Sequence, residues 1–116
     1  MNNGINNVLL AVFIAIILTF METIAQSALR HYYLKKEKNI IYPIICWGIY
    51  AIVPFLLYYS YSFVEEGVIE VFWDAGTTIM VPLAALVLFS ENMTPLGWFG
   101  IVVTTIGTII VGAASI

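Results

Sequence analysis

Apolar residues fill four long stretches of the chain, and short polar segments separate them. The stretches cover residues 8–29, 40–61, 68–89 and 96–113. A helix needs about 20 mainly apolar residues to cross the hydrocarbon core of a bilayer, and each stretch is close to that length. Within lipid a helix also satisfies its own backbone hydrogen bonds. The pattern therefore predicts an all-α integral membrane protein, a bundle of four transmembrane helices that forms one domain over residues 1–116.

Composition supports the same class. Hydrophobic residues make up 62% of the 116-residue chain and charged residues only 9%. A soluble domain of this size leaves much of its surface in water, so it has no place for so many apolar side chains. A cleaved signal peptide is the alternative for the first stretch. We do not expect one, because no Lys or Arg precedes the stretch and its apolar run exceeds the roughly 7–15 residues of a signal core.

The charges are distributed unevenly between the connections. All four basic residues lie between the first two stretches: Arg30, Lys35, Lys36 and Lys38. Connections rich in Lys and Arg stay on the cytoplasmic side of a membrane. We therefore expect a multi-pass protein of the cell (inner) membrane with both termini outside.

Glu22 is the one charged residue within the first stretch. An acidic residue at the centre of a membrane costs roughly 2.5–3.5 kcal/mol, and such residues usually mark an ion or substrate pathway. Thr19 and Gln26 stand three residues before and four after it, so the three share one helical face. This stripe is a candidate site for substrate and protons. The alternative is a structural carboxylate that pairs with Arg30 or with a polar neighbour.

The third stretch carries a pair of acids, Glu70 and Asp74, with Trp73 beside them. Two acids four residues apart on one helical face repel each other. Water, a cation, a basic group or a shared proton between them would relieve that repulsion. We include all three residues in the candidate site, although Glu70 lies near the end of its stretch and is equally explained as an interfacial charge.

Aromatic residues are frequent in the second stretch. Those near its ends suit the aromatic belts of membrane proteins. Trp47 and Tyr50 lie deeper, where they either pack as further anchors or line a cavity.

Small residues recur every four positions in the last stretch, at Gly100, Thr104, Thr108 and Gly112. Such a ladder lets membrane helices approach closely. We predict a helix–helix interface here, either within the bundle or between the subunits of a dimer. Chance spacing in an apolar helix is the alternative.

The sequence favours no enzyme, cofactor, metal or nucleic-acid partner. His31 is the single histidine, and Cys46 the single cysteine, so neither a histidine pair nor a disulfide is available. No glycine-rich phosphate-binding loop follows a strand.

Three segments together resemble the small multidrug resistance family of the drug/metabolite transporter superfamily. They are residues 22–30 (ETIAQSALR), 67–73 (GVIEVFW) and 89–100 (FSENMTPLGWFG). The resemblance implies that Glu22 is a shared site for protons and substrate and that Trp73 lines the binding chamber. Glu70 stands where the family usually has a Tyr that hydrogen-bonds the central Glu, and Asp74 and Ala75 replace a pair of small residues.

The function that this resemblance implies is proton-coupled antiport. Two four-helix chains, identical or related, would enclose a chamber and export small organic cations such as drugs. A polyamine is a further candidate substrate, because Glu70 and Asp74 could engage separated amines. Two alternatives remain open: a half-size metabolite or lipid-linked sugar transporter of the same superfamily, and a non-transporting membrane subunit that assists a partner.

Overall fold

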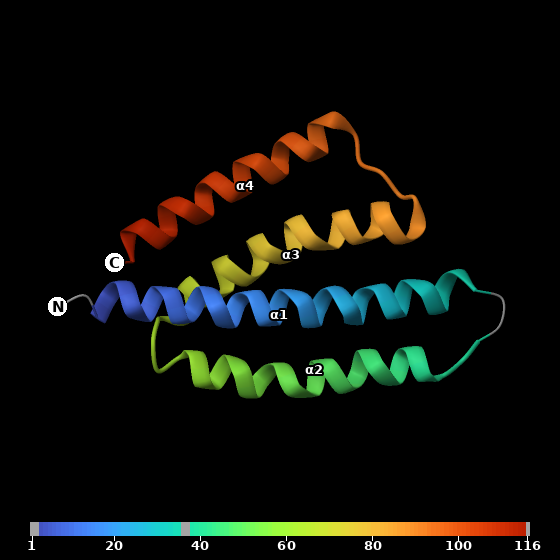
Figure 1. Cartoon of the computed structure of the whole chain (residues 1–116), viewed down its shortest axis with the longest axis horizontal. Helices are drawn as coiled ribbons and strands as arrows, with labels where there is room; N and C mark the ends of the chain where they lie inside the picture. Colours follow the sequence, from blue (N-terminus) through green and yellow to red (C-terminus); the bar gives the residue numbers. More distant parts are fainter. Residues whose placement is uncertain (1–2, 36–37, 116) are drawn as a thin grey trace.

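The computed structural model describes residues 3–35 and 38–115, and these form four α-helices joined by short connections (Figure 1). They are α1 (Asn3–Leu34), α2 (Ile41–Ser60), α3 (Glu66–Phe89) and α4 (Pro95–Ala114). By length and composition, each is able to cross a membrane. The prediction of an all-α, four-helix membrane fold is therefore confirmed.

The helix ends follow local capping more closely than hydropathy. With 32 residues, α1 extends past both ends of the predicted span 8–29. Its backbone hydrogen bonds continue through polar residues at both ends. At the C-terminal end the Lys38 ammonium donates to carbonyls of the last turn, those of Tyr32 at 2.7 Å and Tyr33 at 3.2 Å. At the start of α4, the Thr94 hydroxyl accepts from the amide of Gly97 at 3.2 Å, just before Pro95. The other helix ends lie within two residues of the predicted limits.

The four helices lie side by side in one layer. Their order across the layer is α2, α1, α3, α4, with the principal contacts between α1 and α2, α1 and α3, and α3 and α4 (Figure 1). The Cα atoms extend over 56 × 35 × 16 Å. The Cα atoms of one helix lie on a cylinder roughly 5 Å across, so the shortest dimension indicates that the helices are tilted or staggered in depth. Among the described residues the two edge helices, α2 and α4, make no principal contact with each other, so the chain forms an open layer and not a closed bundle.

The core lies where α1 meets its two neighbours. Leu18 of α1 and Ile69 of α3 are fully buried, and Ala11 and Ala25 let the backbones approach. By contrast, none of the described residues of α4 is fully buried. Its large apolar side chains point outward, and lipid tails solvate them as well as a protein core would. Packing thus fixes α1 most firmly and α4 least.

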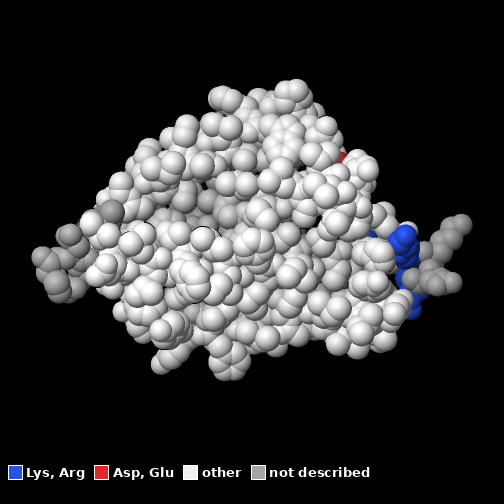
Figure 2. Space-filling model, in the orientation of Figure 1, with Lys and Arg blue, Asp and Glu red and all other residues white. Residues whose placement is uncertain are grey.

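Basic side chains gather at one end of the layer, around the connection between α1 and α2 (Figure 2). Lys36 lies outside the described residues. The Arg30 guanidinium Nε lies 2.9 Å from a Glu91 carboxylate oxygen, which ties the end of α1 to the connection between α3 and α4. The cytoplasmic placement of this end stays a prediction.

Candidate functional site

Glu22 lies near the middle of α1 and points into the junction with α2. Its side chain is half-buried, and the Tyr50 hydroxyl donates to Glu22 Oε1 over 3.3 Å. Hydroxyl–carboxylate bonds are normally about 2.5–2.7 Å long, so this bond is loose. A neutral hydroxyl also leaves the negative charge of the carboxylate uncompensated. The carboxylate thus has one weak hydrogen-bond donor in Tyr50 and no counter-charge from it.

The structural alternative for Glu22 is a pair with Arg30 or with a polar neighbour. Arg30 lies eight residues further along α1, roughly 12 Å along the helix axis. Its guanidinium pairs with Glu91. Glu22 therefore has a polar neighbour in Tyr50 but not the basic partner that would neutralise it.

The two acids of α3 add to the same electrostatic environment. Glu70 is half-buried and Asp74 is exposed. Asp74, Glu66 and Glu22 are the carboxylates within electrostatic reach of Glu70. Within residues 3–35 and 38–115, no Lys, Arg or His forms an ion pair with Glu22, Glu70 or Asp74. One broad face of the layer thus carries three acids inside membrane-spanning helices without a basic partner in the described chain.

Gln26 connects this acidic face to α4. Its side chain lies close to the Tyr50 hydroxyl. It also lines a groove of about 490 Å³ together with Thr77 and Thr78 of α3 and Thr104 of α4. This groove provides hydroxyl and amide groups beside the acids.

Two of the candidate residues turn toward the packed interior. Thr19 is only 4% exposed and lies against Gly76 of α3. Trp73 is half-buried and packs against the hydrophobic core. Its buried indole N–H has no hydrogen-bond acceptor among the described residues. Neither side chain hydrogen-bonds Glu22 in this structure.

The ladder of small residues on α4 faces grooves beside α3. Gly100 and Thr104 line the groove that contains Gln26, whereas Thr108 and Gly112 line a second, larger groove. A Cβ atom at Gly112 would lie 3.4 Å from the ring of Phe72, so the side chain of Phe72 reaches across the groove to the backbone of α4. The role of the ladder in a dimer interface stays a prediction.

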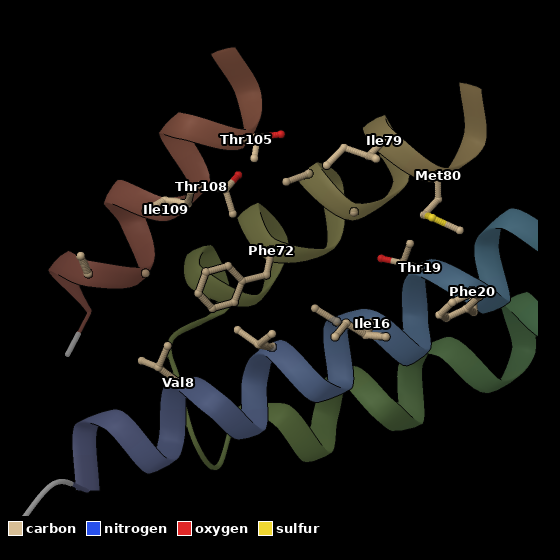
Figure 3. A pocket seen from close by; sticks show the side chains of 16 residues that line it. Val8, Ile16, Thr19, Phe20, Phe72, Ile79, Met80, Thr105, Thr108 and Ile109 are labelled. Atoms are coloured by element: carbon tan, nitrogen blue, oxygen red, sulfur yellow. The ribbon is translucent and has the colours of Figure 1, made fainter. Parts of the chain in front are cut away.

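The larger groove lies between α1, α3 and α4 and has a volume of about 650 Å³ (Figure 3). Its lining is almost entirely apolar and includes Phe20 of α1 and Phe72 of α3. In each helix the Phe stands two residues from an acid, Glu22 or Glu70, which places the two side chains roughly 160° apart around the helix axis. The layer therefore has an acidic face and, on the opposite side, an apolar groove.

Tyr50 is the site residue that sequence reasoning did not select. The aromatic pattern of the second stretch left open whether it packs or lines a cavity. Its depth in that stretch was the available signal, but the face of α2 that meets Glu22 is determined by packing against α1.

Comparisons with protein-family models, with curated proteins and with solved structures find no match. The fold itself defines the class: a small all-α membrane protein with four helices that are each long and apolar enough to span a bilayer.

Proposed function

We propose that this chain is one half of a proton-coupled antiporter that exports small organic cations, with Glu22 as the shared binding group. The observation that carries the proposal is an uncompensated carboxylate near the middle of a membrane-spanning helix, held only by the loose Tyr50 bond. An ionised acid there costs roughly 2.5–3.5 kcal/mol, and either a proton or a cation removes that cost. Because both neutralise the same carboxylate, each displaces the other, and the two fluxes are coupled.

A second chain completes the chamber. The layer is open, and its acidic face, with Asp74 exposed, would otherwise contact lipid. An identical or related chain that presents its own acidic face would shield these carboxylates and enclose a polar space. Secondary transporters commonly place their site between two related halves near the middle of the membrane. Rocking of the two layers would then open the space to one side of the membrane at a time.

The substrate class follows from the additional acids. Glu70 and Asp74 are four residues apart, roughly 6 Å along α3. Together with Glu22 they favour a cation with separated ammonium groups, such as a polyamine, over a compact monovalent cation. The resemblance to the small multidrug resistance family supports an organic cation as the substrate. The hydroxyl that the family usually places on its third helix is supplied here by Tyr50 of α2. The protein is a carrier of the cell membrane, not an enzyme, with its termini outside.

Purified protein in sealed proteoliposomes containing a pH dye tests the proposal. Adding spermidine, or a monovalent aromatic cation, to vesicles with an outward proton gradient should produce substrate-driven proton flux. Glu22→Gln should abolish this flux. Glu66→Gln, which removes an acid at the first turn of α3, should retain it.

Two results would contradict the proposal. Coupled flux that persists in the Glu22→Gln variant would remove this carboxylate from the mechanism. Absence of ligand-driven flux in the wild-type protein, together with a membrane protein that copurifies in fixed ratio, would favour the non-transporting subunit.

A further inference from the structure

A polar pocket lies next to one end of the apolar groove between α1, α3 and α4. At that end the groove is lined by Val8, labelled in Figure 3, and by Ala113 of α4. The polar pocket, of about 410 Å³, is also lined by Val8, and on α4 by Ala114 and Ser115. The apolar groove and the polar pocket therefore adjoin, with Val8 as a shared lining residue.

The groove suits a hydrocarbon chain because it presents hardly any free polar groups. The hydroxyls of Thr105 and Thr108 donate to carbonyls of their own helix, each over 2.9 Å. Along α1 the groove runs from Val8 to Phe20, roughly 18 Å at 1.5 Å per residue. One leaflet of the hydrocarbon core is roughly 15 Å thick, half of the usual core. The groove thus has the length of one extended acyl or alkyl chain in a leaflet.

Its volume of about 650 Å³ leaves room for a hydrocarbon chain along that length.

The polar pocket selects the charge of the headgroup. Asn7, Glu65 and Ser115 line it. Glu65 forms no ion pair within residues 3–35 and 38–115. The Ser115 hydroxyl donates to the Val111 carbonyl at 2.7 Å, so its oxygen remains available as an acceptor. Carboxylate, amide and hydroxyl oxygens attract an ammonium group and repel a phosphate or carboxylate.

We infer that the groove and the polar pocket together form a binding site for a single-chain amphiphile with a cationic head. The ammonium group lies among Asn7, Glu65 and Ser115, and the alkyl chain follows the groove between α1, α3 and α4. The site lies on the opposite side of the layer from Glu22. It therefore does not depend on the antiport proposal, and the two can fail separately.

The test uses the full-length protein in nanodiscs of zwitterionic lipid and two photoreactive probes with the same chain, a diazirine dodecylamine and a diazirine laurate. Peptide mapping after illumination locates the label, and competition with unlabelled dodecylamine measures affinity. The amine should label residues 105–115 saturably and at lower concentration than laurate. Because a single partly exposed charge pair is worth little, Glu65→Gln should reduce the preference for the amine by roughly two- to fivefold. Glu66→Gln is the matched control and should leave the preference almost unchanged.

A second pair of variants tests the groove independently of the charge. Thr108→Phe adds a ring inside the groove and should abolish saturable labelling. Val103→Phe adds the same ring on the exposed side of α4 and should preserve it. Thermal unfolding of both variants verifies that each is folded.

Three results would overturn the inference. Equal labelling by amine and laurate would show that the pocket does not select charge. Label spread evenly around α4, unaffected by Thr108→Phe in a folded protein, would indicate ordinary annular lipid. Absence of saturable labelling in the wild-type protein would show that the groove is closed in the bilayer.

Discussion

Gly76 is the position where a single added methyl group should do most damage. It lies where α1 and α3 pack together. A Cβ atom there would overlap the Thr19 hydroxyl oxygen and lie 3.2 Å from Thr19 Cβ and from Thr19 Cγ2. Thr19 is only 4% exposed, so its side chain has little room to rotate away. Gly76→Ala must therefore push α1 and α3 apart.

The expected loss of stability in Gly76→Ala is the difference between two opposing effects. Overpacking a well-packed interior typically costs about 1–3 kcal/mol. Replacing Gly by Ala within a helix returns about 0.5–1 kcal/mol, because Ala loses less backbone entropy. We expect Gly76→Ala to lower the free energy of unfolding by about 1–2 kcal/mol. Since α1 carries Glu22 and α3 carries Asp74, the same displacement should also weaken cation binding.

Reversible unfolding of the purified protein in mixed micelles, followed by tryptophan fluorescence, measures this cost. Gly48→Ala is the matched control, because a Cβ atom at Gly48 meets nothing within 4 Å. The Thr19→Ala background removes the overlapping hydroxyl and Cγ2 but keeps Cβ. In that background most of the cost of Gly76→Ala should disappear, giving a coupling energy of about 1 kcal/mol between the two sites. A Gly76→Ala variant as stable as Gly48→Ala, or a coupling energy near zero, would refute the proposed packing of α1 against α3.

Three further predictions concern single contacts. Tyr50→Phe removes the hydroxyl that is hydrogen-bonded to Glu22. Because that bond is long, we expect cation affinity, measured by isothermal titration calorimetry, to fall by only about two- to tenfold. Unchanged affinity would show that the hydroxyl does not contribute to binding. In a double-mutant cycle of unfolding free energies with Arg30→Gln and Glu91→Gln, the exposed ion pair should contribute about 0.2–1 kcal/mol and should weaken as salt is added. A larger, salt-independent interaction energy would contradict its exposed geometry. Thr94→Ala removes the cap of α4 and should cost about 1 kcal/mol in unfolding measurements, with faster amide exchange in the first turn of α4, whereas unchanged exchange would argue against the cap.

Hydropathy alone predicts most of this fold. Each span needs a long apolar stretch, and within lipid only a helix satisfies all its backbone hydrogen bonds inside one segment. The prediction was less accurate for the ends of α1. Capping by Lys38 and the continuing backbone ladder extend that helix beyond its apolar residues.

The candidate site was only partly accessible from sequence. Glu22 is recognisable because a lone acid in an apolar stretch is costly whatever surrounds it. Its neighbour Tyr50 is 28 residues away in the sequence, and only the packing of α2 on α1 brings the two together. Thr19 shares a helical face with Glu22, yet α3 covers Thr19 whereas Glu22 stays half-buried. The spacing of residues along one helix does not show which of them a neighbouring helix will cover.

The apolar groove could not be predicted from any single stretch. Val8, Phe72 and Thr108 belong to three helices, and each on its own is an ordinary apolar or small residue of a membrane span. Their meeting depends on α4 packing mainly on α3, which leaves a gap beside α1.

An even number of helices also constrains how two such chains could be joined covalently. Gly4 and Ser115 line the same small pocket, so the beginning of the first helix and the end of the last are neighbours. A short tether from one copy to the next would leave both copies inserted in the same direction. A tandem protein with its second half inserted in the opposite direction would require one more membrane crossing in the tether. The number of crossings in the tether of an engineered fusion therefore determines whether its two halves are inserted in the same or in opposite directions.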